Sequence, residues 1–191
     1  MIKMKAQARV LGIDDGCFER FKSKKVIIAG VVSRLDGYIE GILSTEVAVD
    51  GTDSTSKLAD MVYKSRFKNE LRALMMHGFT LAGFNIIDAF ALNKKTKIPV
   101  ICILRRHPNK KKVLNALEKL KKGRERKIKL FKKIGKMEKC GALYFKAIGI
   151  EDKKAKELIR RTTKRGNMPE PVRLAHLVAS GISRGESKGR A

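Results

Sequence analysis

Tryptophan is absent from this chain of 191 residues, and cysteine is scarce, with only three residues. Cys17, Cys102 and Cys140 lie far apart and include no C-x-x-C pair, which excludes a disulfide scaffold and is typical of a reducing compartment. The three histidines show no zinc-ligand spacing, so no structural zinc site is predicted. No apolar run approaches the ~18 residues that a bilayer span needs, and no apolar stretch of signal-peptide length follows the N-terminus. We therefore expect a soluble, cytoplasmic protein.

Acidic residues are also scarce, because 19 Asp and Glu stand against 44 Lys and Arg, for a net charge of +25. The hydrophobic fraction of 43% is enough for a buried core, which excludes wholesale disorder. The length suits one domain, so we expect residues 1–191 to form a single unit with a basic helical segment at 105–139 and C-terminal helices over 151–182.

The positive charge is unevenly distributed along the chain. Residues 1–104 carry +5, residues 105–139 carry +13 and residues 140–191 carry +7. Apolar residues in 105–139 recur at helical spacing, which predicts an amphipathic helix with lysines on its outer face. Charge this dense favours a polyanionic partner, above all nucleic acid. The alternatives are a solvated surface suited to heat or salt, or a helix bound to a membrane surface.

The order of predicted elements indicates an α/β protein with a ribonuclease H-like mixed sheet: a three-stranded meander, extended by parallel strands and flanked by helices. Turn residues and β-branched runs define the strands, and apolar periodicity defines the helices. The predicted strands are 8–13, 25–33, 38–49, 72–77, 98–104 and 141–148, and the predicted helices are 56–71, 86–95, one in the basic segment, 151–165 and 169–180.

Several aspartates follow predicted strands, where residues distant in sequence can meet at one edge of a sheet. Asp14 ends the first strand, Asp50 and Asp53 follow the third, and Asp88 comes after the fourth. Clustered carboxylates repel unless a cation bridges them, and Mg²⁺ prefers oxygen ligands. These four residues are therefore candidate metal ligands for phosphodiester hydrolysis, with Mg²⁺ or Mn²⁺ as the cofactor. The alternatives are helix capping for Asp53, an interaction with the helix dipole for Asp88 and a simple turn for Asp50.

Four segments together resemble the largely archaeal endonuclease dU family, across nearly the whole chain. They are Leu11–Gly16 (LGIDDG), Val49–Thr55 (VDGTDST), His77–Asp88 (HGFTLAGFNIID) and Arg173–Ile182 (RLAHLVASGI). That family is distantly similar to endonuclease V, a ribonuclease H-like enzyme that uses Mg²⁺ to nick a strand near a deaminated base. The resemblance implies an endonuclease that cleaves DNA at or near deoxyuridine or a similar residue.

The resemblance also implies roles for individual residues. Asp14 matches the metal-binding aspartate of the first strand. The segment Gly37–Gly41 (GYIEG) is similar to the wedge motif PYIPG without its prolines, which implies that Tyr38 inserts beside the lesion; the alternative is a hairpin-tip aromatic without a ligand. The connection Gly78–Asn85, including Phe79 and Asn85, would contact the base.

Three positions depart from the endonuclease V motifs. Val47 stands where a metal-binding glutamate is expected, and Ile150 lies where that family has a histidine. His77 replaces the aspartate of an Asp-Gly-His-Gly motif, so it is a candidate metal ligand or water-positioning residue, with a buried structural histidine as the alternative. Arg173 and His176 are interpreted as packing and polar anchors of the last helix.

These observations lead to a hypothesis with two rivals. The chain is predicted to be a metal-dependent endonuclease in DNA repair, with Asp14, Asp50, Asp53, Asp88 and His77 at its catalytic site. The rivals are a non-catalytic nucleic-acid-binding protein and an RNA-processing protein of the same fold. The residues expected to contact phosphates in the basic segment are Arg105, Arg106, Lys110, Lys111 and Lys112.

Overall fold

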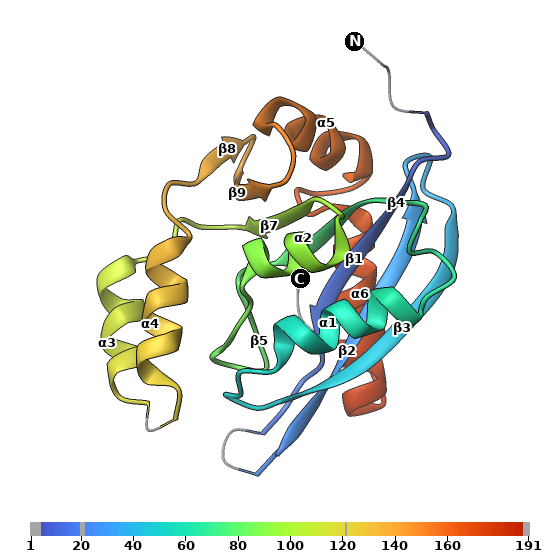
Figure 1. Ribbon diagram of the computed structural model, residues 1–191. Helices are drawn as coiled ribbons and strands as arrows, with labels where there is room; N and C mark the ends of the chain where they lie inside the picture. Colours follow the sequence, from blue (N-terminus) through green and yellow to red (C-terminus); the bar gives the residue numbers. More distant parts are fainter. Residues whose placement is uncertain (1–4, 20–21, 121, 189–191) are drawn as a thin grey trace.

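The computed structural model describes residues 5–19, 22–120 and 122–188 (Figure 1). Within these ranges the strands are β1 (Arg9–Asp15), β2 (Lys25–Arg34), β3 (Ile39–Ala48), β4 (Leu71–His77), β5 (Thr80–Leu81), β6 (Asn85–Ile86), β7 (Val100–Leu104), β8 (Glu138–Cys140) and β9 (Leu143–Ile148). The helices are α1 (Ser54–Lys64), α2 (Ala89–Thr96), α3 (Lys110–Glu118), α4 (Arg124–Lys133), α5 (Asp152–Thr162) and α6 (Glu170–Arg184).

Seven strands form one mixed sheet in the order β3-β2-β1-β4-β7-β9-β8. Strands β1, β2 and β3 are an antiparallel meander, and β4 and β7 extend it in parallel with β1. This confirms the predicted arrangement of a meander lengthened by parallel strands. Strands β9 and β8 then continue the sheet in antiparallel pairings, and the short β8 was not predicted.

Helices cover both faces of the sheet: α1 and α2 pack on one face, and α5 and α6 pack on the other (Figure 1). Alternate residues of a strand point to opposite faces. In β1, Leu11 and Ile13 belong to the apolar cluster that includes α1 and α2, whereas Val10 belongs to the cluster that includes α5. Asp14 therefore shares the face of α5 and α6, and Asp15 shares the face of α1 and α2.

Gly12 allows α6 to cross β1 at very short range. A Cβ atom on Gly12 would lie 2.1 Å from the carbonyl carbon of Pro171 and 2.5 Å from the backbone nitrogen of Val172. Only glycine leaves room for this approach of two backbones. The start of α6 is thereby held directly over the strand that ends in Asp14.

The basic segment forms two helices rather than the single one predicted. Gly123 adopts a left-handed conformation with φ 65° and precedes α4, so it breaks the helix between Glu118 and Arg124. Figure 1 shows α3 and α4 side by side at one edge of the molecule. On the inner side of α4, Lys127 is fully buried and its Nζ donates to the Asp50 carbonyl at 2.5 Å. This contact joins the helical pair to the turn after β3.

Several other element boundaries also differ from the sequence predictions, and two of them have a clear local cause. α1 ends at Lys64 instead of residue 71, because the backbone turns at Ser65 and reaches β4 through hydrogen-bonded turns. α2 begins at Ala89 instead of residue 86, because the Asp88 side chain accepts from the backbone N–H groups of Phe90 and Ala91. The predicted loop 78–85 contains β5 and the start of β6, which pair as a small hairpin.

Candidate active site at the end of β1

Asp14 lies near the carboxyl end of the inner strand β1 and is 3% exposed. The parallel register pairs Ile13 of β1 with Met76 of β4, so the next residues, Asp14 and His77, end neighbouring strands. The Nδ1 atom of His77 is 3.9 Å from the Asp14 Oδ2 atom. The structure therefore brings together two of the residues that the sequence predicts for the site.

His176 of helix α6 is the third member of this group. It lies on α6, one turn after Val172, and its Nδ1 is 3.1 Å from the Asp14 Oδ2 atom. The sequence pattern indicated packing and anchoring for His176, so this contact was missed. One signal was present: His176 shares the buried helical face of Val172, Ala175 and Ala179, where a polar side chain needs a partner.

The two histidines have opposite electrostatic environments. The hydrogen bond with Asp14 is the main cause that raises the pKa of His176, and the charge of Asp14 adds to it. Burial is the main cause that lowers the pKa of His77; Asp14 opposes it, whereas Arg105 and His176 lower this pKa further. His176 therefore favours the protonated imidazolium form, whereas His77 favours the neutral form.

Asp15 turns away from Asp14 toward the β5–β6 hairpin. Its Oδ2 accepts from the backbone N–H of Ala82 at 2.5 Å. Burial, followed by the charge of Asp14, raises the pKa of Asp15 to about 6. The end of β1 therefore holds two neighbouring carboxyl groups that ionise together only at a cost in free energy.

Asp50 and Asp53 also bind residues of the β5–β6 hairpin. Asp50 has a φ of 50°, and its Oδ1 accepts from Phe84 N at 2.7 Å. The Asp53 Oδ1 accepts from Asn85 Nδ2 at 2.6 Å, and both Asp53 oxygens accept from Ala48 N at 3.2 and 3.3 Å. Asp53 occupies the N-cap position of α1 without a side-chain capping bond. These contacts hold a loop in place beside the site.

Asp88 belongs to a different part of the molecule. Its carboxylate caps α2, and Lys133 Nζ lies 3.3 Å from both of its oxygens. In the described part of the chain, no three or more His, Cys, Asp or Glu side chains are grouped to hold a metal ion. The predicted ligand set of Asp14, Asp50, Asp53 and Asp88 is thus not assembled.

The end of β1 fits an ion that is held mainly by water and substrate. Mg²⁺ in phosphate-processing sites is commonly held by one or two carboxylates, with waters and substrate phosphate completing the shell. Asp14 supplies one such carboxylate, whereas Asp15 points to the opposite face of the sheet and binds Ala82 N. A divalent cation at Asp14 would offset the negative charge that helps to raise the pKa of Asp15.

Two of the residues predicted to contact the base lie elsewhere. Tyr38 is 64% exposed but follows the β2–β3 turn, where Arg34 pairs with Arg9, at the opposite end of β1 from Asp14. Arg9 and Asp14 are five residue steps apart along the strand, or about 17 Å. Asn85 is fully buried, and its amide binds Ala48, Ser54 and Asp53. A wedge at Tyr38 beside Asp14 and a direct contact by Asn85 are therefore not supported.

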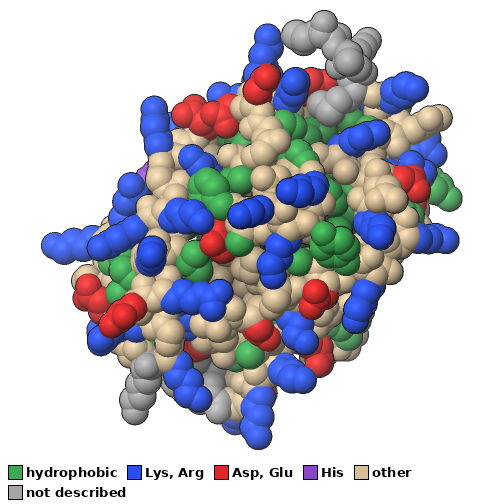
Figure 2. Space-filling model, in the orientation of Figure 1, with side chains coloured by type: hydrophobic (Ala, Val, Ile, Leu, Met, Phe, Trp, Pro, Cys, Tyr) green, Lys and Arg blue, Asp and Glu red, His purple; other side chains and the backbone are tan. Residues whose placement is uncertain are grey.

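The basic segment offers an extensive cationic surface. Fourteen of its Lys and Arg residues are exposed, among them Arg105, Arg106 and Lys110–Lys112. Figure 2 shows Lys and Arg side chains on many parts of this face, including the edge formed by α3 and α4. Arg105 directly follows β7 and acts electrostatically on His77, so the cationic surface reaches the candidate site.

The seven-stranded mixed sheet flanked by helices defines an α/β protein of endonuclease V-like fold. The crystal structure of endonuclease V from Ciona intestinalis, in complex with a 24mer DNA containing an inosine followed by a ribo-adenosine, shares this fold with a TM-score of 0.55 at 14% identity, over 90% of this chain and 84% of that one. The chain belongs to the endonuclease dU family, whose sequence pattern matches residues 6–183.

Closer relatives are archaeal. The UPF0215 protein of Thermococcus sibiricus is 43% identical, with 97% of each chain covered. The crystal structure of an Archaeoglobus fulgidus protein of unknown function matches with a TM-score of 0.85 at 37% identity, over 91% of this chain and 97% of that one. Family membership supports a nuclease, a hydrolase of phosphodiester bonds. Among the described residues, no helix is both long and apolar enough to span a membrane.

Proposed function

We propose that this chain is a metal-dependent endonuclease that nicks DNA at or near deaminated bases such as deoxyuridine. The observation that carries the proposal is the Asp14–His176 hydrogen bond, with Asp15 and His77 adjacent, at the end of β1 in a member of the endonuclease dU family. The cationic surface next to this group suits a nucleic-acid backbone.

The residues of the site would divide the work as follows. Asp14 would hold a divalent cation together with waters and the substrate phosphate, and this cation supplies charge stabilisation for the phosphate and activates water when bound. His176 orients Asp14 through its Nδ1 hydrogen bond, because a residue that is hydrogen-bonded to a metal ligand fixes the orientation of that ligand. His77, kept neutral by burial, can accept a proton from a water or donate a hydrogen bond to a phosphate oxygen.

The proposal is tested by incubating the purified protein with Mg²⁺ or Mn²⁺ and duplexes that contain deoxyuridine, deoxyinosine or neither. We expect nicking of the modified duplexes, loss of nicking with EDTA, and a fall of about 10–100-fold in His176→Gln. Asp14→Asn, which keeps the shape of the buried side chain, should lose more. Tight binding of every duplex without any nicking would instead favour a non-catalytic binding protein.

The nucleic acid itself is tested in the same assay. Single-stranded RNA and DNA of matched sequence, each with one uracil or hypoxanthine, compete with the duplex substrate. Preferential cleavage of the RNA would replace the DNA-repair proposal with RNA processing by the same site.

A further inference from the structure

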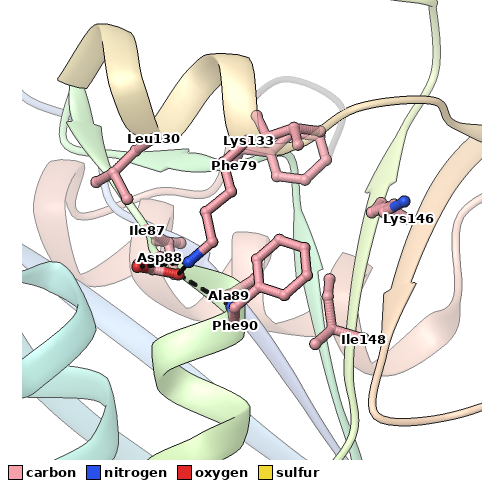
Figure 3. A pocket seen from close by; sticks show the side chains of 10 residues that line it. Phe79, Ile87, Asp88, Ala89, Phe90, Leu130, Lys133, Lys146 and Ile148 are labelled. Atoms are coloured by element: carbon pink, nitrogen blue, oxygen red, sulfur yellow. Dashed lines mark hydrogen bonds and ion pairs between the residues drawn. The ribbon is translucent and has the colours of Figure 1, made fainter. Parts of the chain in front are cut away.

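A hollow beside α2 has the composition of a binding pocket for a planar ring. Its walls come from α2, α4, β9 and the segment after β4, and its volume with the open mouth is about 240 Å³. The apolar wall consists of Phe79, Ile87, Leu130, Ile134 and Ile148, and the polar lining residues are Asp88, Lys133 and Lys146. Figure 3 shows Lys133 reaching from α4 to Asp88, with the ring of Phe90 beside it.

Lys133 occupies the mouth of this pocket. Its Nζ lies 4.7 Å from the centre of the Phe90 ring and 3.3 Å from the Asp88 carboxylate. The enclosed space that remains is about 10 Å³, room for one water molecule. The Lys133 side chain is 46% exposed, so its ammonium can shift to the rim of the pocket while the ring of Phe90 stays in place. A ring that replaces the ammonium over Phe90 would then lie against the apolar wall.

The Asp88 carboxylate has one oxygen available for a ligand. Its Oδ1 accepts from Phe90 N at 3.1 Å and from Ala91 N at 3.0 Å, whereas Oδ2 meets only Lys133 among the described residues. The Asp88 side chain is 17% exposed, so Oδ2 is near the surface of the pocket. The pocket thus presents a hydrogen-bond acceptor beside a cationic donor.

This pair matches the chemical change that deamination makes in a base. Cytosine and adenine present a ring-nitrogen acceptor beside an amino donor. Deamination converts that edge into a lactam, in which a ring N–H donor lies beside a carbonyl acceptor. A carboxylate next to an ammonium complements the lactam, because the carboxylate accepts from the ring N–H and the ammonium donates to the carbonyl. Against cytosine or adenine, the carboxylate would face the ring-nitrogen acceptor and the ammonium would face the amino donor, so these buried polar groups would stay unpaired.

We propose that this pocket binds the lactam edge of a base such as uracil and excludes the parent cytosine; thymine and guanine present the same N–H and carbonyl pair. Asp88 Oδ2 accepts from the ring N–H, Lys133 donates to the adjacent carbonyl, and Phe90 stacks on the ring. The proposal rests on the function proposed above and adds to it the group that distinguishes a damaged base from its parent. It also assigns Asp88 to recognition instead of metal binding.

The test measures binding without cleavage. Fluorescence anisotropy gives the Kd of the protein for single-stranded oligonucleotides that differ in one central base, uracil or cytosine, in EDTA and about 0.3 M salt. We expect the wild-type protein to bind the uracil strand roughly five- to hundredfold more tightly, the discrimination typical of a two-bond base contact.

Three variants separate recognition from general binding. Asp88→Asn keeps a good N-cap for α2 but offers both a donor and an acceptor, so the uracil-to-cytosine ratio of affinities should fall toward one. Lys133→Met keeps the apolar stem and should also lower the ratio. Lys132→Met removes the same charge from the neighbouring exposed position of α4, so affinity falls for both strands and the ratio stays.

The outcomes distinguish this proposal from the nuclease proposal. A wild-type protein without preference for uracil, or an unchanged ratio in both Asp88→Asn and Lys133→Met, overturns the pocket even if nicking is observed. A preference that depends on Asp88 and Lys133 supports the pocket even if no duplex is nicked, in which case only the nuclease proposal fails.

Discussion

Replacing Gly12 by alanine should disturb the active site through packing alone. The added Cβ would lie 2.1 Å from the Pro171 carbonyl carbon, whereas ordinary contacts begin at 3.4 Å, so the start of α6 must retreat by about 1.3 Å. The hydrogen bond from His176 to Asp14 would lengthen from 3.1 Å to about 4 Å, beyond hydrogen-bonding range. Both the stability of the fold and the pKa of His176 should therefore change.

The expected sizes follow from the same geometry. Overpacking of this kind costs about 1–3 kcal/mol, which for a domain of this size lowers Tm by roughly 3–10 °C. The pKa of His176 is raised chiefly by its hydrogen bond to Asp14, so it should fall toward the ordinary histidine value in Gly12→Ala. Calorimetry measures the first effect. An NMR titration of the imidazole C–H resonances, assigned with His176→Gln, measures the second.

Gly181→Ala is the matched control on the same helix. Its Cβ would meet nothing closer than 3.9 Å, and its backbone φ is not in the left-handed region. Alanine there should stabilise α6 by about 0.5–1 kcal/mol and leave the His176 titration unchanged. A Gly12→Ala protein with an unaltered Tm and an unaltered His176 pKa would refute the close contact between α6 and β1.

Three further predictions concern charge. Because the pKa of Asp15 rises from 3.8 to about 6 on folding, protonation of this carboxyl stabilises the folded state. As the pH rises from 4 to 6 in EDTA, the wild type should lose about 2 kcal/mol relative to Asp15→Asn, as urea unfolding at several pH values would measure. His176 has a raised pKa, so its contribution to stability is present below about pH 6.5 and is lost as the pH rises through its folded pKa. Unfolding of His176→Gln should accordingly differ most from the wild type at acidic pH, and an identical pH dependence would contradict the Asp14–His176 pair. Replacing Lys110, Lys111 and Lys112 by glutamine should reduce the slope of log K against log salt by up to about 2.7 if all three contact phosphates, and an unchanged slope would remove α3 from the interface.

Local patterns predicted most of the strands and helices. The β-branched run of β2 and the apolar periodicity of α6 depend on nearest neighbours in the sequence, so they could be assigned before the fold was known. The split of the basic segment at Gly123 was missed, because lysine-rich helical patterns continue on both sides of it. The short β8 carries too few residues for any pattern and exists through its pairing with β9.

The candidate site was only half predictable. Asp14 was found because an aspartate at the end of a buried strand serves no evident cap or turn there. His176 was missed because its partner lies 162 residues away, and only the crossing of α6 over Gly12 brings them together. Asp50, Asp53 and Asp88 were predicted as ligands from their places after strands, but the contacts that occupy their oxygens depend on loops folding back from elsewhere in the chain.

The sequence alone therefore determined the sheet, the basic surface and one carboxylate of the site, because composition and periodicity are properties of neighbouring residues. Only the tertiary structure decided that Tyr38 lies at the far end of β1, that His176 joins Asp14, and that Asp88 faces Lys133 in a pocket. Each of these depends on strand register or on helix packing. Both are set by the burial of whole faces and not by any one segment.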